Sequence, residues 1–548
     1  MSMLKRPKSI FSIACLFLFL FGFKALLHGF PDIERFFAEW NDERLTLTYI
    51  MKFGTLNFAP TQIWHPPLYH YLTFIPIALF YSIGKLIGLF HDKIGFMGLY
   101  FDKMHYFFFI GRLMSYVFYW ASAIMIYRIS RLFFGRTISR LTTLAYLLIP
   151  RLILDFSTTR PETLLLFNSA VFFYFIFKHY LNPVKVKYLY FAAFFLGVSI
   201  ATKYNAVLLG SIFAPILFYR RKDIFKIFLG LCFFSFIGFF VSDPFFIIRF
   251  SKYFHNFMVY NEEVKYYWSS PAVFFVTHLK ELTSFMYLNP VGFVVLIFGA
   301  CAMLKKDKKL FCIVFFTAMA YEVYFGIFRN TQSPLRYLNP IFPLFALFFS
   351  AGADFLIKKN RKLFYGIIAI FIGILSYNYF EISHNLSYRP TYIQKARAYI
   401  ENTVPEFTNI CVFSNSYIPQ LNMTEKSYHH LIETAPKVKA VEGHELNYIE
   451  MDDRDKYDDY VTMLRIESLA KKPQYNLIRW DSGIETEAEA VKFLNKLNIK
   501  YVISSDPAII NNKKIELTNI ASLVKKFEPI DIRVYAPKTV YIYRVNEN

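Results

Sequence analysis

Long apolar runs separated by short polar segments dominate the first 382 residues of the chain. Each run is about 20 residues long, which is the length that a helix needs to cross the hydrocarbon core of a bilayer. The pattern therefore predicts eleven membrane-spanning helices. They occupy residues 10–30, 112–133, 138–154, 162–181, 187–203, 205–219, 224–245, 285–304, 309–327, 338–357 and 362–382.

The basic residues decide which runs are counted as crossings. They gather in six short segments, at Lys5/Arg6/Lys8, Arg128/Arg131/Arg136/Arg140, Lys185/Lys187, Arg220/Arg221/Lys222, Lys305/Lys306/Lys308/Lys309 and Lys358/Lys359/Arg361/Lys362. The positive-inside rule places all six on the cytoplasmic side. Counting the run 68–90 as a further crossing would move the cluster at 128–140 outside. We therefore interpret 68–90 as a helix in the outer interface, so that residues 31–111 form one external loop.

The last part of the chain, residues 383–548, has a different pattern. Short β-rich runs at 410–413 and 501–504 accompany a helical stretch at 485–497, which predicts a small α/β domain. The run 10–30 is not followed by a small-residue cleavage pattern, so we interpret it as a retained helix with a cytoplasmic N-terminus. The prediction is a polytopic α-helical membrane protein, with a transmembrane module at 1–382 and an extracytoplasmic soluble α/β domain at 383–548.

Composition and charge exclude other classes of protein. With 55% apolar, 20% aromatic and 18% charged residues among 548, a soluble enzyme is excluded. The tail from residue 383 contains 22 basic and 22 acidic residues, so the net charge of +21 lies entirely in the membrane part. It is a topology signal and does not indicate a nucleic-acid partner. The five Cys form neither a disulfide framework nor a metal-ligand cluster.

Charged residues gather at the predicted external ends of the helices. They are Asp42, Glu43, His65, Asp155, Arg160, Glu162, Lys203, Asp243, Arg329 and Arg336. An ionisable group near the bilayer is costly and often functional, although one at a helix end can also reach the headgroups. Acidic and basic groups that meet at the outer surface suit chemistry on an anionic lipid headgroup.

Five short segments, in this order, carry a resemblance to a known family. They are Trp40-Asn41-Asp42-Glu43-Arg44, Trp64-His65-Pro66-Pro67-Leu68, Thr159-Arg160-Pro161-Glu162, Gly197-Val198-Ser199-Ile200-Ala201-Thr202-Lys203-Tyr204 and Arg336-Tyr337-Leu338-Asn339-Pro340. The series resembles the GT-C membrane glycosyltransferases, specifically the branch of the protein O-mannosyltransferases and the aminoarabinose transferase of lipid A. The resemblance covers about residues 10–382 and implies the GT-C fold, whereas the tail is similar only in position.

The resemblance implies that a sugar moves from a polyprenyl-phosphate sugar to an acceptor hydroxyl on a lipid, glycan or protein. A hydroxyl is a poor nucleophile, so a carboxylate must take its proton. Asp42 matches the aspartate of the family's Asp-Glu motif and is the candidate base, with Glu43 beside it. Cations should stabilise the departing lipid phosphate. The candidates are His65, Arg336, Lys203 and Arg160, with Glu162, Arg44 and Tyr337 as supporting residues.

Two positions depart from the aminoarabinose branch. Arg44 follows the Asp-Glu pair directly, whereas in that branch one residue intervenes, which puts the role of Arg44 in doubt. His65 replaces a Lys of that branch, and a neutral imidazole neutralises less phosphate charge than an ammonium does. Mannosyltransferase-like relatives do have His-Pro-Pro-Leu, so the residue at this position can depend on which sugar the donor carries.

Each candidate also has a purely structural interpretation. Asp155 and Asp243 are predicted to be structural residues. Asp42 and Glu43 could instead cap a helix, and His65 could be a turn residue. Arg160 and Glu162 could form an ion pair at a helix start. The Arg336 side chain could reach the headgroups, and Lys203 could anchor a hinge between two helices.

The scheme requires no cofactor and no metal, although a divalent cation could share the charge of the phosphate.

The alternative function is a lipid or oligosaccharide transporter or flippase. Such proteins often show paired repeats and ionisable groups at mid-helix depth. Here no repeat is seen, and few charges other than Glu322 and Lys24 fall in the centres of spans. A scaffold that acts through its tail is a third alternative. For an enzyme of this kind with a large external tail, we expect a bacterial inner membrane.

Overall fold

The computed structural model describes residues 7–27, 41–56, 58–60, 66–218, 224–251, 282–328, 334–385, 392–413, 473–480, 484–504, 508–510, 514–528, 539–546 and a few isolated positions. The chain divides into two compact units. The helical unit comprises Met1–Leu26, Thr46–Pro76 and Ile110–Leu386, and the mixed unit comprises Leu27–Leu45, Ile77–Phe109 and Ser387–Asn548. The predicted domain boundary after residue 382 stays a prediction, because compactness alone does not locate a membrane border.

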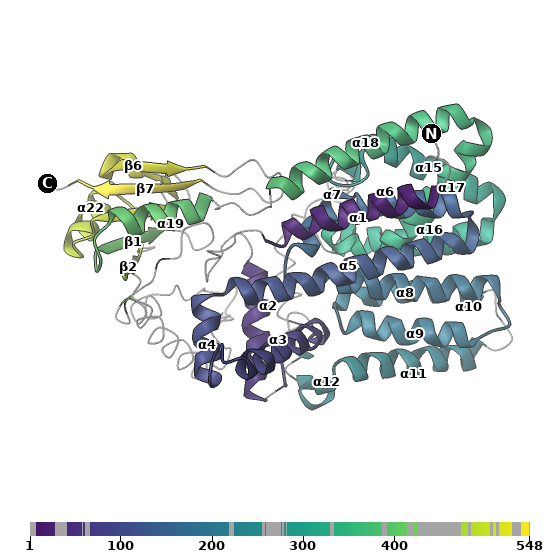
Figure 1. The fold of residues 1–548 in the computed structure, drawn as a ribbon, viewed down its shortest axis with the longest axis horizontal. Coiled ribbons are helices and arrows are strands. Elements are labelled where there is room, and N and C mark those ends of the chain that lie inside the picture. Colours follow the sequence, from purple (N-terminus) through teal and green to yellow (C-terminus); the bar gives the residue numbers. More distant parts are fainter. Residues whose placement is uncertain are drawn as a thin grey trace. The chain divides into compact units, whose positions relative to one another are not determined.

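Helices occupy all eleven predicted spans (Figure 1). The unbroken ones are α1 (Pro7–Ala25), α5 (His105–Phe133), α8 (Glu162–Leu181), α9 (Lys187–Ile200), α11 (Ile224–Ser242), α15 (Asn289–Lys306), α16 (Lys308–Phe328) and α18 (Arg361–Asn385). Within the described part of the chain, six helices are long and apolar enough to cross a membrane, or seven if one bent pair is a single span. The prediction of a polytopic α-helical membrane protein is confirmed.

Three predicted spans are not continuous α-helices. The span at 138–154 consists of α6 (Arg136–Leu147) and α7 (Pro150–Phe156), which are bent by 63°. Pro150 explains the break, since it lacks an N–H and its ring clashes with the preceding turn. The spans at 205–219 and 338–357 begin with 3₁₀ helices. These are η4 (Tyr204–Ile212) before α10 (Phe213–Phe218), and η6 (Pro334–Ile341) before α17 (Phe342–Lys359).

Two glycines allow close packing between neighbouring helices of the bundle. Helices α8, α9 and α11 lie side by side (Figure 1), and a Cβ atom at Gly197 or Gly238 would clash with the backbone of the facing helix in the α9–α11 contact. Small residues allow this close approach.

The span that contains α17 is 78% buried, whereas that of α11 is only 17% buried. The apolar side chains of α11 are therefore placed to face lipid, while α17 lies inside the bundle.

Most of the described part of the predicted external loop is helical. It contains α2 (Asn41–Lys52), η3 (Phe53–Thr55), α3 (Leu68–Leu86) and α4 (Lys93–Asp102). The run 68–90 forms a helix as far as Leu86, and its location in the membrane interface stays a prediction. Inside the mixed unit, ring contacts join the second half of α3 to α4 and the start of α5, as in the pair Phe80–Phe96 with centroids 5.9 Å apart.

The tail forms the predicted α/β domain. Its five-stranded sheet has the order β2 (Asn476–Arg479), β1 (Asn409–Phe413), β3 (Tyr501–Ser504), β7 (Val540–Val545) and β6 (Ala521–Phe527). Strand β1 pairs in parallel with β2 and β3, whereas β7 is antiparallel to both of its neighbours. The other elements are α12 (Phe245–Ile248) in the helical unit and α19 (Tyr392–Thr403), α22 (Glu487–Lys496), α23 (Leu517–Ile520), β4 (Ala508–Ile510) and β5 (Lys514–Glu516) in the tail.

Local sequence explains α22 and the strands. Thr486 and Glu489 form a reciprocal capping box at the start of α22, which satisfies backbone N–H groups that would otherwise lack partners. Cys411 in β1 is fully buried and packs in one cluster with Val502 of β3 and Tyr543 of β7. Both predicted strands and the predicted helix of the tail are therefore confirmed.

Candidate active site

Buried charges gather in the helical unit at the irregular junctions between helices. The end of α7, the start of α8, the turn between α9 and η4, and η6 all contribute. Asp155, Arg160, Glu162 and Lys203 are each buried there. A buried charge costs a large free energy of desolvation unless it has partners. The contacts of these residues therefore indicate what each one does.

Lys203 and Glu162 form a buried ion pair. The Lys203 Nζ atom lies 3.1 Å from Glu162 Oε1. Glu162 is the first residue of α8, and Lys203 has an extended backbone directly before η4, so the pair joins two helix starts. The structure thus pairs Glu162 with Lys203, a pairing that the sequence did not predict. The predicted alternative, an ion pair between Arg160 and Glu162, stays a prediction.

Tyr337 lies on the other side of the lysine. The Lys203 ammonium is 5.0 Å from the centroid of the Tyr337 ring, within the range of a cation–π interaction. The amide of Asn205 donates a hydrogen bond to the backbone carbonyl of Tyr337 at 3.3 Å, and Tyr321 Oη donates to the Asn205 carbonyl at 3.1 Å. These contacts fix η6 against η4, so three predicted site residues lie together.

Asp155 is held by two partners from different helices. Arg151, one turn earlier in α7, lies 3.7 Å from Asp155 Oδ1, and Asn339 Nδ2 of η6 donates to Oδ2 at 3.0 Å. The charges of Arg160 and Glu162 also act on this carboxylate. Asp155 therefore links the bent span to η6.

Arg160 is buried in the segment between α7 and α8. Its carbonyl accepts a hydrogen bond from Ser115 Oγ of α5 at 3.3 Å. Ser115 Oγ is also 2.7 Å from Tyr69 Oη, which donates to the Gly111 carbonyl at 3.0 Å. The start of α3, the middle of α5 and the Arg160 segment are thereby tied together in one polar network.

The start of α3 also contacts the segment that carries Lys203. The Leu68 N–H donates to the carbonyl of Ala201 at 3.4 Å. Pro66 and Pro67, the described part of the His-Pro-Pro motif, directly precede this contact. Two of the five motifs, far apart in sequence, therefore meet at the ends of α3 and α9.

Asp243 forms a second buried acidic position, directly after α11. Its Oδ2 accepts a hydrogen bond from Tyr253 Oη at 2.7 Å. Nearby, Arg249 Nη1 donates to the carbonyl of Pro60 at 3.1 Å, which connects the end of α12 to the external loop. The structural role of Asp243 stays a prediction.

The remaining predicted residues are only partly described. Asp42 and Arg44 lie in the first turn of α2, and Arg336 lies in η6, but their side chains are outside the described residues. His65 is wholly outside them. Glu43, also in the first turn of α2, is fully buried. The catalytic role of Asp42 and Glu43 and the phosphate-binding roles stay predictions.

In the described part of the chain, no group of three or more His, Cys, Asp or Glu side chains is placed to hold a metal ion. The expectation that no metal is required stays a prediction.

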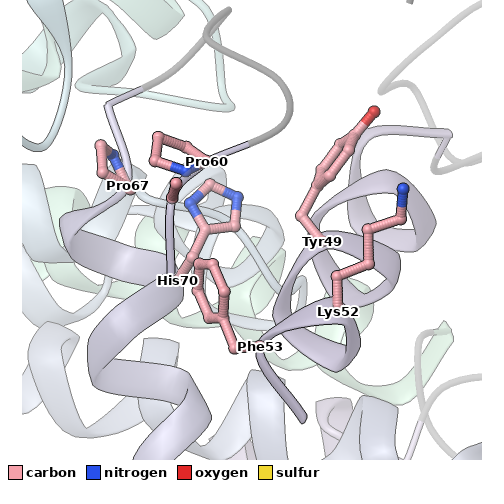
Figure 2. A pocket seen from close by; sticks show the side chains of 7 residues that line it. Tyr49, Lys52, Phe53, Pro60, Pro67 and His70 are labelled. Carbon is pink, nitrogen blue, oxygen red and sulfur yellow. The ribbon is translucent and has the colours of Figure 1, made fainter. Parts of the chain in front are cut away.

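Several residues of this region were not singled out from the sequence. Arg151 is four residues before Asp155, a spacing that indicates a helical ion pair. Asn339 belongs to the last of the five motifs but had no assigned role. Tyr49, Lys52 and His70 line a cavity (Figure 2), and only the fold could reveal it because they come from two separate helices.

Comparisons with known proteins agree with this architecture. A family described as dolichyl-phosphate-mannose-protein mannosyltransferase matches residues 106–248, which include α5 to α11. No curated protein matches the chain in a sequence search. Among solved structures, ArnT from Cupriavidus metallidurans in the apo state is similar at 11% identity and a TM-score of 0.50, covering 98% of each chain.

Two further structures are similar. ArnT from the same organism, bound to undecaprenyl phosphate, has 12% identity and a TM-score of 0.50, again covering 98% of each chain. An oligosaccharyltransferase from Archaeoglobus fulgidus, in complex with Zn and sulfate, has 12% identity and a TM-score of 0.45, covering 89% of this chain and 67% of that one. The likeness to ArnT confirms the predicted GT-C fold. The family match agrees with the resemblance seen in the sequence over residues 106–248.

Proposed function

We propose that this chain is a GT-C membrane glycosyltransferase that moves a sugar from a polyprenyl-phosphate sugar to an acceptor hydroxyl on the extracytoplasmic side of the membrane. Two comparisons support a lipid-phosphate donor. The matching family is described by a dolichyl-phosphate-linked mannose, and one similar structure has undecaprenyl phosphate bound. In both, the lipid is a long isoprenoid with a phosphate at its end.

One observation carries the proposal. Residues from three of the five motifs, predicted either as phosphate-binding or as supporting residues, lie in one region of the helical unit. They are Arg160, Glu162, Lys203 and Tyr337. Buried charges are costly, so their concentration at helix junctions favours a functional site over a chance arrangement.

In the proposed reaction Asp42 is the general base. As the acceptor oxygen forms a bond to C1 of the sugar, the Asp42 carboxylate takes the hydroxyl proton. The bond between C1 and the phosphate oxygen breaks, and its electron pair leaves with the polyprenyl phosphate. Glu43, next to Asp42 and buried, supports the base.

The growing charge on the phosphate requires cations. The proposal assigns this role first to His65 and Arg336. Lys203 already shares its charge with Glu162 at 3.1 Å, which reduces the attraction it can offer to an anion. Lys203 therefore acts mainly as a positioning residue, and Arg160 is a further cation of the same region. No metal takes part in this scheme.

The proposal includes the orientation of the chain. The basic loops are cytoplasmic, which places the N-terminus in the cytoplasm and the tail outside. A bacterial inner membrane is the proposed location. The acceptor is a lipid, glycan or protein that carries the hydroxyl.

The experiment is a transfer assay with purified protein. Radiolabelled polyprenyl-phosphate sugars serve as donors and a membrane extract serves as the acceptor pool. Asp42→Asn should lower transfer by about 10²–10⁴-fold, because the amide cannot accept the proton and has nearly the same shape. The matched control is Asp354→Asn, which changes a carboxylate at the far end of α17 and should retain transfer.

Retained turnover in Asp42→Asn would refute the assignment of the base. If the wild type transfers label from none of the mannose, glucose, aminoarabinose and galacturonic acid donors, a flipping assay in vesicles should follow. Lipid movement without transfer in that assay would favour the transporter alternative.

A further inference from the structure

Two short turns in the helical unit have the same sequence pattern and the same local structure. One joins α15 to α16 and the other joins α17 to α18. Their sequences are Lys305-Lys306-Asp307-Lys308-Lys309 and Lys358-Lys359-Asn360-Arg361-Lys362. In each turn the central side chain accepts a hydrogen bond from the backbone N–H three residues later, that of Leu310 or Leu363, at 3.0 Å. Each turn therefore begins the next helix at once and carries four cations around one capping residue.

The helices that lead into these turns are in close contact. The rings of Tyr287 and Phe342, at the starts of α15 and α17, have centroids 6.3 Å apart, so the two helices run in the same direction. A Cβ atom at Gly299 or Gly352 would clash with the backbone of the facing helix. Each turn begins about 10 Å beyond its glycine, because a helix rises 1.5 Å per residue. The two basic turns therefore lie beside each other at one end of the bundle.

The basic side chains of the two turns are exposed, and little negative charge lies among them. All eight cations are exposed. The carboxylates nearest in sequence are Asp307 and Asp354. Asp307 caps α16 and accepts a hydrogen bond from Tyr180 Oη at 2.7 Å, and Asp354 pairs with Lys358 at 2.7 Å. Eight cations beside two carboxylates leave a net charge of +6 on this surface.

Apolar side chains beside the turns form a continuous exposed surface. Phe298 of α15 and Phe355 of α17 are 42% and 37% exposed, and their rings stack with centroids 6.3 Å apart. The Lys359 Nζ atom lies 5.9 Å from the centroid of the Phe355 ring, so a cation adjoins this apolar surface. Leu304 and Leu363, next to the two turns, are also exposed. An acyl chain can pack on the stacked rings while its headgroup contacts the lysines.

The two turns thus offer two equivalent basic sites next to one apolar surface. We propose that together they bind one anionic phospholipid that carries two phosphates, of the cardiolipin type, from the cytoplasmic leaflet. Basic surfaces beside membrane-spanning helices attract anionic headgroups, and two phosphates in one molecule make the second contact intramolecular. The surface lies at the end of α17 that is distant from η6. The inference therefore goes beyond the proposed glycosyl transfer and does not depend on it.

The test measures lipid binding to the purified full-length protein in detergent by native mass spectrometry. Cardiolipin and phosphatidylglycerol with the same acyl chains are titrated separately. We expect the wild type to bind cardiolipin about tenfold more tightly, because only cardiolipin can reach both turns. Lys306→Gln and Lys359→Gln should each weaken cardiolipin binding about fivefold, and the double variant about thirtyfold. Each turn keeps its other cations, so the topology signal remains.

The matched control is Lys185→Gln/Lys187→Gln, which removes exposed lysines from another turn on the predicted cytoplasmic side and should bind cardiolipin like the wild type. Lys306→Arg/Lys359→Arg keeps both charges and should bind within about twofold of the wild type. An equal loss in the control would overturn the inference, since the lysines would then act only through net charge. Equal affinities of the wild type for the two lipids would also overturn it. Displacement of cardiolipin by undecaprenyl phosphate would overturn it by assigning the turns to the carrier.

Discussion

Two lysine–carboxylate pairs lie at opposite ends of the segment formed by η6 and α17. Near η6, Lys203 and Glu162 are 3.1 Å apart, and their side chains are only 6% and 3% exposed. Near the end of α17, Lys358 and Asp354 are 2.7 Å apart, and their side chains are 68% and 22% exposed. From distance alone, loss of the Lys358–Asp354 pair would be expected to cost more stability. Because Lys203 and Glu162 are buried, breaking their pair should instead cost the larger free energy of unfolding.

The difference fits the proposed function, which places the chemistry at the η6 end of the bundle. Charges at the end of α17, such as Lys358 and Lys359, remain in contact with water and fit the predicted cytoplasmic side. At the η6 end, desolvation of Lys203 and Glu162 is offset only by specific partners, so their geometry is fixed. A fixed set of buried charges is what a site that stabilises a developing phosphate charge requires.

The largest expected contrast in stability comes from removing each lysine. Lys203→Met should lower the free energy of unfolding by about 3–5 kcal/mol, because Glu162 is left buried without its counter-charge. Lys358→Met should change it by less than about 1 kcal/mol. Thermal unfolding of the purified variants in detergent measures both. The double variant Lys203→Met/Glu162→Leu should recover part of the loss, and equal small shifts for the two lysines would remove the basis of the comparison.

A neutral partner at the η6 end should have an intermediate effect. Asn339→Leu removes the hydrogen bond to Asp155 at 3.0 Å and leaves a buried oxygen without that donor, which should cost about 1–3 kcal/mol. The control is Asn378→Leu in α18. The Asn378 amide donates to the Ile374 carbonyl one turn earlier in the same helix. Because its loss leaves no buried carboxylate without a donor, it should lower the free energy of unfolding by less. The same unfolding assay compares them, and a larger loss for Asn378→Leu would contradict the account.

Much of the fold follows from local pattern. The spans and the strands at 410–413 and 501–504 could be predicted because hydrophobic period and length report burial directly. Pro150 in the sequence is a known helix breaker. The bend was nevertheless not predicted, because the apolar run continues on both sides of this proline. The 3₁₀ starts of two spans depend on packing between distant segments, which periodicity does not report.

The candidate site was predictable only as a set of residue types. The ordered motifs brought Glu162, Lys203 and Tyr337 into consideration, but the pairing of Lys203 with Glu162 required the fold. Asn339 gained its role as a partner of Asp155 in the same way. The cavity with Lys52 and His70 was missed because it arises where two helices of the external loop face each other, and no spacing along the chain signals it.

The most direct test of the central claim is to locate the carrier phosphate. A cryo-electron microscopy map of the purified protein with undecaprenyl phosphate would show at which end of the bundle the phosphate binds. The account predicts phosphate density at the junction of η4 and η6, near Lys203 and Tyr337. Density of the carrier at the opposite end, beside Lys305 and Lys358, would contradict it.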